Sequence, residues 1–217
     1  MAITTYAELQ TAIGNWLGRP ADPVIAPIIP DWIALTEARY NRELRLRAME
    51  ARATANVSSQ YLALPTEFLE LRNIQLNTDP RTSLEYLEPK AIDELWAGSV
   101  SGRPRYFSII NDEIQLAPAP DAPYEAEIAY WKKVPALTAT SQVNIVLTGA
   151  PDVYLFGALA EAAAYLGDDE HFGPWDARYQ LAVRRLRDSD ERGNAGPAMR
   201  IRPQGVSFRD GNIRSLP

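Results

Sequence analysis

The sequence predicts a mainly α protein of the α+β class, with a helical bundle core, an inserted small antiparallel β region and an extended C-terminal arm. Three observations lead to this prediction. Apolar residues recur at helical spacing near both ends of the chain, whereas residues 51–131 change to the two-residue period of strands. Residues 193–217 are broken by glycine and proline and carry no core of their own. We therefore expect one domain, residues 1–192, followed by the arm.

The first helix is predicted over residues 5–18. Thr5 and Glu8 have the spacing of a capping box, in which each side chain bonds the other residue's backbone N–H. Apolar residues then repeat at helical spacing until Gly18, where the pattern ends. The next segment, residues 19–30, holds four prolines and is predicted to be a broken connector.

A longer second helix is predicted over residues 30–48, with one apolar stripe. Another face carries Arg39, Glu43 and Arg47, which are spaced four residues apart, so opposite charges stabilise the helix weakly. Arg42 precedes Glu43 in the same segment. The simpler interpretation is a solvated charged face, and the alternative is a face that packs against a partner.

The middle of the chain is predicted to consist mainly of short strands. Extended segments are expected at residues 51–57, 60–64, 71–76 and 84–89. Helical turns are expected at residues 65–69 and 89–96. An antiparallel meander is predicted from residues 105–110, 112–116 and 124–131, with its first tight turn at Asn111-Asp112. Residues 132–150 are predicted to form a loop.

Two further helices are predicted over residues 151–167 and 168–192, with Gly167 as the stop between them. Each has a wide apolar stripe, so the two are expected to pack together. The second one carries Arg184 and Arg187 with acidic residues close behind them. This pattern favours a solvated face or one that forms ion pairs with a neighbouring subunit, and a nucleic-acid patch is the less favoured alternative.

Composition excludes several classes of site. The chain has 217 residues, no cysteine and one histidine, so disulfides, thiolate metal sites and multi-histidine zinc sites are excluded. His171 follows three acids at the start of a predicted helix, where capping explains the cluster better than a metal does. We find no nucleotide-binding glycine motif and no nucleophile elbow. No cofactor is therefore expected, and no stretch is apolar enough to span a membrane.

The charge is unevenly distributed. The chain carries a formal net charge of −6, yet residues 193–217 hold four arginines against one aspartate, which makes the arm about +3 and the body about −9. An acidic body argues against general nucleic-acid binding, because that affinity comes from neutralising phosphates. A basic arm on an acidic body indicates that the arm has a partner.

Several stretches of this chain resemble the head-to-tail connector, or adaptor, proteins of tailed bacteriophages and gene transfer agents. In chain order the resembling stretches are residues 5–9, 29–45, 61–72, 101–106, 130–137 and 151–161. The most characteristic of them read IPDWIALTEARYNRELR, YLALPTEFLELR and PDVYLFGALAE. No single stretch is diagnostic, but their order and spacing are. Residues from Gly193 onward lie outside this resemblance.

The resemblance implies a structural virion protein, one subunit of a ring of twelve copies that joins the portal to the tail or stopper and continues the DNA channel. Such a protein is assembled in the host cytoplasm, ends in the neck of the virion, and is not an enzyme. The arm would bind the portal through Arg200, Ile201, Arg202, Phe208, Arg209, Ile213 and Arg214. Ring contacts between neighbouring copies would involve Arg39, Arg42, Glu43, Arg47, Arg184 and Arg187.

Two other functions remain open from the sequence. The carboxylate pairs Glu67/Glu70 and Glu125/Glu127 could serve a tail-associated hydrolase, although an exposed strand face explains the second pair more simply. A regulatory DNA-binding protein that uses the helix around Arg184 is the second alternative, and the acidic composition disfavours it.

Overall fold

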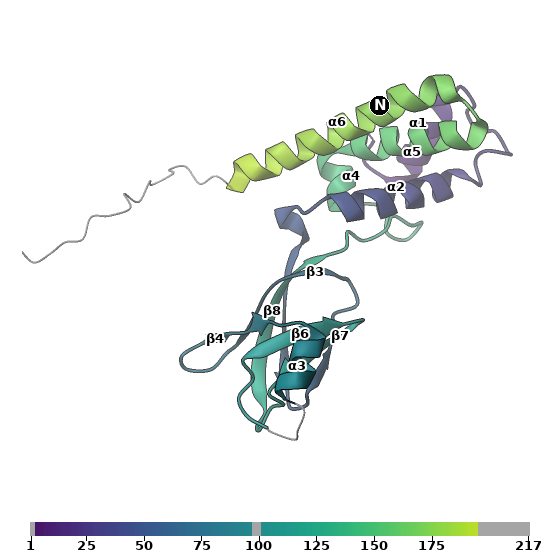
Figure 1. Cartoon of the computed structure of the whole chain (residues 1–217). Coiled ribbons are helices and arrows are strands. Elements are labelled where there is room, and N and C mark those ends of the chain that lie inside the picture. Colours follow the sequence, from purple (N-terminus) through teal and green to yellow (C-terminus); the bar gives the residue numbers. More distant parts are fainter. Residues whose placement is uncertain (1–2, 97–100, 195–217) are drawn as a thin grey trace, which may run out of the picture.

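The structure, a computed structural model, describes residues 3–96 and 101–194 (Figure 1). It is mixed α+β, which confirms the predicted class. With 44% helix and 24% strand, it is less helical than the mainly α protein with a helical bundle core that the sequence predicted. A layer of helices holds both ends of the described chain, and a separate β region lies on one side of this layer. The chain passes from the helices into the β region after residue 43 and returns after residue 132. The β region is therefore an insertion between helices, as the sequence indicated.

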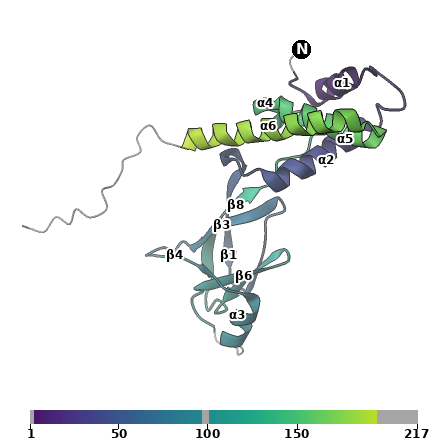
Figure 2. The ribbon, with the colours of Figure 1, turned by 45° about the horizontal axis from the view of Figure 1, so that its top comes forward.

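Five helices form the helical layer, and Figure 2 shows the long ones side by side. They are α1 (Tyr6–Trp16), α2 (Ile29–Glu43), α4 (Ile145–Gly149), α5 (Pro151–Leu166) and α6 (Asp169–Asn194). Helix α2 lies nearest the β region and α1 lies far from it. The C-terminal part of α6 extends beyond the other helices.

Helix α5 occupies the centre of this layer and is apolar on most of its circumference, as expected of a helix buried among others. Gly157 allows its neighbours to approach closely. A Cβ atom at this position would lie 2.4 Å from Cγ2 of Thr36 on α2 and 3.1 Å from the Tyr179 ring on α6. The absence of a side chain at Gly157 is therefore what lets three helices meet here.

The predicted capping box at the start of α1 is confirmed. The backbone N–H of Glu8 donates to Oγ1 of Thr5 at 3.3 Å, and the N–H of Thr5 donates to Oε2 of Glu8 at 3.1 Å. Leu9 and Ile13, one turn apart, are completely buried. The cap thus fixes where the helix begins, and the apolar stripe fixes the face that packs.

The second helix is shorter than the predicted 30–48, because α2 ends at Glu43 and Leu44 is extended. Leu44 and Leu46 are both buried, and in an extended chain residues two apart point to the same side. A continued helix would turn them about 200° apart. An extended conformation therefore lets both leucines pack into the core, and this explains why the helix ends at Glu43. A short 3-10 helix, Arg47–Met49, then leads into the first strand.

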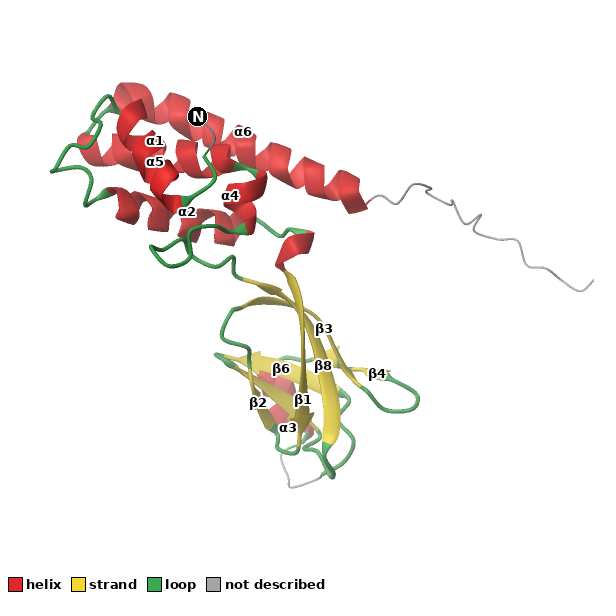
Figure 3. Cartoon of the chain, turned by 180° about the vertical axis from the view of Figure 1, so that it is seen from behind, coloured by secondary structure: helices red, strands yellow, loops and turns green. Residues whose placement is uncertain are grey.

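The β region contains two small sheets and one helix (Figure 3). One sheet has the order β1-β8-β3-β4 and comprises β1 (Glu50–Val57), β8 (Tyr124–Lys132), β3 (Phe68–Leu76) and β4 (Thr82–Ser83). The other has the order β2-β7-β6-β5 and comprises β2 (Tyr61–Ala63), β7 (Glu113–Ala117), β6 (Tyr106–Ile110) and β5 (Glu85–Tyr86). The helix is α3 (Pro89–Leu95).

The β region has an apolar core of its own, separate from that of the helices. Its completely buried side chains include Leu76, Ile114 and Leu116, which come from both sheets. Along β8, Ala126 and Ile128 are buried while the glutamates between them are not, so the predicted alternation of a packed and a wet face is confirmed.

The predicted meander is only half correct. Strands β6 and β7 pair antiparallel around the Asn111 turn, where Asn111 adopts a positive φ of 53° that asparagine tolerates. Strand β8 instead joins the other sheet, where it lies between β1 and β3. Two features account for this difference. The six-residue connection 118–123 is long enough to carry the chain from one sheet to the other, and β8 can pair with β1 over all eight residues of β1.

Two local predictions were wrong for identifiable reasons. Residues 65–69 form one turn, with the Phe68 N–H on the Pro65 carbonyl at 2.9 Å, but Phe68 already begins β3. The predicted loop 132–150 contains α4, which starts where Asn144 accepts the Leu147 N–H at 2.9 Å. Five residues are too few to show a helical period.

Candidate assembly interface

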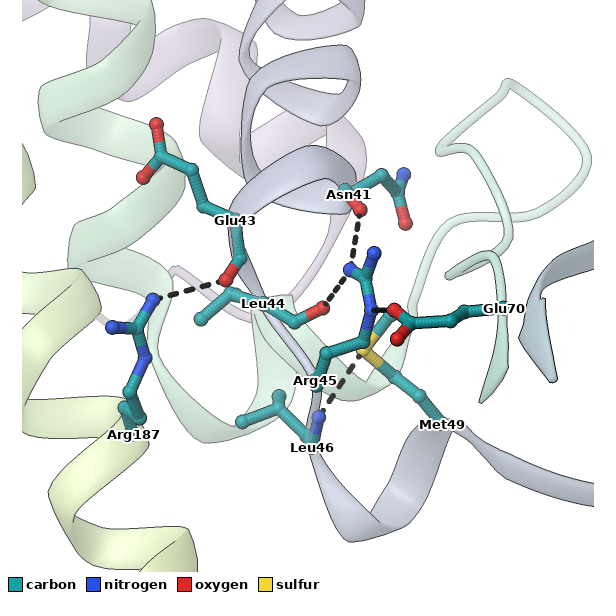
Figure 4. A network of polar contacts seen from close by, with 8 residues as sticks. All are labelled: Asn41, Glu43, Leu44, Arg45, Leu46, Met49, Glu70 and Arg187. Atoms are coloured by element: carbon teal, nitrogen blue, oxygen red, sulfur yellow. Dashed lines mark hydrogen bonds and ion pairs between the residues drawn. The ribbon is translucent and has the colours of Figure 1, made fainter. Parts of the chain in front are cut away.

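The helices and the β region meet at a charged seam formed by α2, α6, β1 and β3. Arg45, two residues beyond the end of α2, is the central residue, because its side chain bonds both α2 and β3 (Figure 4). Its guanidinium donates to the carbonyls of Asn41 and Leu44 at 3.0 and 2.7 Å, and to Oε2 of Glu70 at 2.7 Å. One side chain therefore satisfies the carbonyls at the end of α2 and ties them to β3. The sequence analysis missed this residue.

The C-terminal half of α6 is held against the end of α2 by two arginines. Arg187 donates to the carbonyl of Glu43 at 2.9 Å (Figure 4). Arg47 donates its backbone N–H to Asp190 at 3.0 Å and its guanidinium to the carbonyl of Gly193 at 3.1 Å. These bonds explain why the overhanging part of α6 stays close to the start of β1.

Arg39 lies deeper, between α2, α5 and α6. It bonds Asp176 at 2.5 Å, lies 3.6 Å from Glu43 and 3.9 Å from Glu161, and stacks 4.2 Å over the ring of Tyr179. Burial, the largest single cause, would lower the pKa of the guanidinium, but the hydrogen bond to Asp176 and the charges around it together outweigh burial, so the pKa is raised. This arginine is thus engaged inside its own subunit.

The six predicted ring-contact residues fall into two groups. Four of them bond within the chain, namely Arg39, Glu43, Arg47 and Arg187. The other two, Arg42 and Arg184, are exposed on α2 and α6 and form no ion pair within the described residues. The two exposed arginines remain the better candidates for contacts with a neighbouring copy. The predicted arm residues, from Arg200 to Arg214, lie outside the described residues.

A buried polar cluster links α2, α5 and the connector before α4. Glu37, only 7% exposed, accepts the Leu137 N–H at 2.8 Å and the Tyr154 hydroxyl at 2.9 Å. The Tyr154 oxygen in turn accepts from the Asn144 amide at 2.6 Å and lies 2.7 Å from the Tyr40 hydroxyl. Burial raises the pKa of Glu37 above its usual range, and its two hydrogen bonds oppose the rise.

This cluster, hereafter the Glu37 cluster, was not predicted, because its members are far apart in the sequence and lie in apolar stripes. Burial also raises the pKa of Tyr40 and of Tyr154, so both hydroxyls stay protonated and can donate. The cluster fixes the connector that brings the chain back from the β region. Tyr40 and Tyr154 are completely buried, and Glu37 nearly so, which suits a structural cluster.

One member of each carboxylate pair considered for hydrolysis bonds an arginine. Glu70 bonds Arg45, and Glu127 lies 3.4 Å from the guanidinium of Arg52. His171 is exposed and bonds Asp168 at 2.8 Å, which also caps α6 by accepting the His171 N–H at 3.2 Å. The hydrogen bond between them raises the pKa of His171 and lowers that of Asp168. Within residues 3–96 and 101–194, no group of three or more histidine, cysteine, aspartate or glutamate side chains is arranged to bind a metal ion.

Exposed apolar side chains lie at both ends of the molecule. In the helical layer the most exposed are Val24, in the connector between α1 and α2, and Leu35 and Tyr165 on α2 and α5; in the β region they are Tyr86 and Leu95. An aromatic group on α1, α5 and α6 consists of Trp16, Phe156 and Trp175, with Arg178 stacked over the last two. Aromatic residues and arginine are enriched at protein interfaces.

The exposed aromatic residues and arginines suit contacts with other proteins. A family comparison adds independent information on the class of protein. A family model described as SU10 adaptor protein matches residues 4–202. The chain belongs to this family of phage head-tail adaptors. The resemblance inferred from the sequence is thereby confirmed, with one correction: the match continues past Gly193 to Arg202. No curated protein matches the chain.

Membership of the SU10 adaptor protein family makes this chain a bacteriophage adaptor protein and a component of the virion. The family is one of structural proteins that join other phage components. Within the described residues, none of the helices has the length and apolar character needed to cross a membrane.

Proposed function

We propose that this adaptor forms a ring of twelve copies between the portal and the tail, continues the DNA channel, and acts by binding without catalysing a reaction. Family membership carries this proposal. Two structural features support it. The arginines of the charged seam stiffen the subunit from within, and exposed arginines and aromatic residues remain for contacts with other chains.

Ring contacts are assigned to the exposed faces of α2 and α6. Arg42 lies on α2 with Leu35, which is 52% exposed, and Arg184 lies on α6 with Leu181, which is 46% exposed. A ring forms when two different faces of one subunit join head to tail and the rotation closes. An apolar residue beside an arginine on each face provides buried area together with a charge that sets register.

The arm is assigned to the portal and the β region to the tail. Residues Arg200, Ile201, Arg202, Phe208, Arg209, Ile213 and Arg214 would supply the portal contacts. On the β region, the exposed Tyr86 and Leu95 are suited to a tail or stopper protein. The acidic body would repel phosphate and so limit adhesion of DNA that passes through the ring.

The test is the solution mass of the purified chain, measured by light scattering alone and after mixing with the portal protein of the same phage. A complex whose mass corresponds to a ring of adaptor subunits on the portal supports the proposal. Arg42→Glu together with Arg184→Glu should prevent the ring. The control Lys90→Glu changes an exposed residue on α3, away from both proposed ring faces, and should leave the ring intact. A chain that never associates with the portal contradicts the proposal.

A further inference from the structure

A narrow neck of two chain segments joins the helical layer to the β region (Figure 3). The neck consists of residues 49–50, which lead into β1, and residues 132–134, which lead from the end of β8 back to the helices. Met49 and Val134 are buried in the helical core, whereas the strands that they adjoin line the β core. Each segment therefore passes from one core to the other within a few residues.

Little apolar contact crosses the neck. In the described part of the chain, no helix of the layer packs along a strand of the β region, and the two apolar cores share no residue. Leu69 of β3 and Trp131 of β8 touch the helical core, and both are only partly buried. Because buried apolar area is what fixes one packed unit on another, this small contact leaves the angle between the two parts weakly determined.

Two open clefts flank the neck. One, of about 710 Å³, lies between α6 and the strands and is lined by Asp190, Glu191 and Trp131 among others. The other, of about 190 Å³, lies between the neck and the start of α4, with Met49 and Ile145 in its lining. The first alone has room for roughly 20 water molecules, at about 30 Å³ each. A motion that narrows or widens these clefts moves water and displaces no packed side chain.

One ion pair spans the junction. Among the ion pairs of residues 3–96 and 101–194, the pair of Arg45 with Glu70, 2.7 Å apart, is the one that joins the helical layer to the β region. Arg45 is also fixed to the end of α2 through two carbonyls (Figure 4). Glu70 is 58% exposed, so salt screens the pair and its contribution is small. The contact can therefore set the angle of the β region and can also be released.

We propose that the β region swings as one body on this neck, and that the Arg45–Glu70 ion pair is a releasable strap that holds it in the position seen here. The motion is a hinge, because the change is confined to the few residues where each segment leaves its core. It goes beyond the function proposed above, since it concerns the single subunit and requires no ring. A partner bound to the β region can then change position while the contacts made by the helices stay in place.

Distances between spin labels, measured by double electron–electron resonance, test the hinge. Ala177→Cys on α6 and Ser58→Cys, directly after β1, place one label in each part, and the natural chain has no cysteine. Ser58 lies about 26 Å from the neck at about 3.3 Å per residue, so a swing of about 20° moves it by about 9 Å. Labelled chain is diluted into excess unlabelled chain, so that only distances within one subunit are measured.

Two further label pairs report on each part alone. Ala7→Cys with Ala177→Cys lies within the helical layer, and Ser58→Cys with Lys90→Cys lies within the β region. Raising the salt concentration from about 0.05 M to about 0.5 M should broaden the distance distribution between the two parts at least twofold, because salt weakens the strap. Both internal pairs should keep their widths.

A matched pair of variants separates the strap from general screening. Glu70→Gln removes the charge of the strap and leaves the bonds of Arg45 to α2 intact, so it should broaden the same distribution at low salt. Glu67→Gln changes an exposed glutamate on the same side of the neck that forms no ion pair within the described residues, and it should leave the distribution narrow.

Two results would overturn the proposal. The first is a distribution between the two parts that stays as narrow as those of the internal pairs, both at high salt and in Glu70→Gln. The second is equal broadening by Glu67→Gln and Glu70→Gln, which would remove the role of the strap. Portal is absent from these measurements, so a failed hinge leaves the proposed ring untouched, and a chain that ignores the portal leaves the hinge untouched.

Discussion

The helical layer and the β region differ in the size of their apolar cores and in how many of their buried polar atoms have a hydrogen-bond partner. Twenty-five buried apolar residues form the helical core and ten form the β core. Five buried side-chain atoms of the described residues lack a hydrogen-bond partner, and four of them lie in the β region, on Asn77, Arg103, Ser108 and Gln115. The helical core is thus the larger of the two, and most of the buried polar atoms without a partner lie in the β region.

The largest effect is expected from removing a central side chain of the helical core. Leu159→Ala on α5 should lower the free energy of unfolding by about 2–5 kcal/mol, because Leu159 is completely buried. Chemical denaturation followed by circular dichroism measures this loss. Ile114→Ala removes an equally buried side chain from the β core. If the helical layer and the β region unfold in separate transitions, each variant should shift only the transition of the region that contains it. A common shift would show one cooperative unit instead.

A smaller effect is expected from Glu37→Gln, since the amide leaves one buried donor or acceptor unsatisfied at a cost of about 1–3 kcal/mol. The pH dependence gives a sharper test. Because burial raises the pKa of Glu37, the folded state holds the proton to higher pH than the unfolded chain does. The wild type should therefore lose stability, relative to Glu37→Gln, as pH rises from about 4.5 through the raised pKa. Parallel pH profiles would contradict this.

Arg39→Met should cost about 1–3 kcal/mol, because it leaves Asp176 without its closest partner while keeping most of the apolar stem. Arg42→Met on the same helix is the matched control and should stay within about 0.5 kcal/mol of the wild type, because Arg42 is exposed. Thermal unfolding of both variants measures the difference. Equal losses would mean that Arg39 contributes no more than a surface charge.

The smallest effect on global stability is expected from Arg47→Ala, about 0.5–1 kcal/mol, because the Arg47 side chain is half exposed and the backbone N–H of residue 47 can still bond Asp190. Its local effect should be larger. Amide exchange should accelerate over residues 187–193, where α6 overhangs the other helices, and not over residues 176–183, where α6 is packed. If both segments accelerate together, the overhang is not held by Arg47.

The sequence predicted the long helices, the position of the β insertion and the family, because caps, apolar stripes and glycine stops are local signals. It could not predict which sheet β8 joins. The strand just before β8 in the sequence, β7, was expected to be its partner, whereas β8 pairs with β1 and β3, which lie much earlier in the chain and leave no local pattern of pairing. It extended α2 too far, because the burial of Leu44 depends on helices more than 100 residues away.

The candidate site was predicted less well than the fold. Arg39, Glu43 and Arg47 were predicted on one face of the second helix and Arg187 on the last helix, all as candidates for contacts with a neighbouring subunit, and their bonds within the chain were not predicted. Their partners Asp176 and Asp190 lie more than 130 residues away along the chain, so an internal ion pair leaves no local pattern. The Glu37 cluster was missed for the same reason, because a lone glutamate in an amphipathic helix normally faces water.

The insertion of the β region between helices also determines the order in which the protein can fold during synthesis. All strands of both sheets, residues 50–132, leave the ribosome before α5 begins at Pro151. The β core can therefore assemble while the chain is still growing, since domains fold as units during translation. Helices α1 and α2 emerge first but complete their packing last, and until α5 and α6 arrive their apolar stripes are the surface that a chaperone would cover.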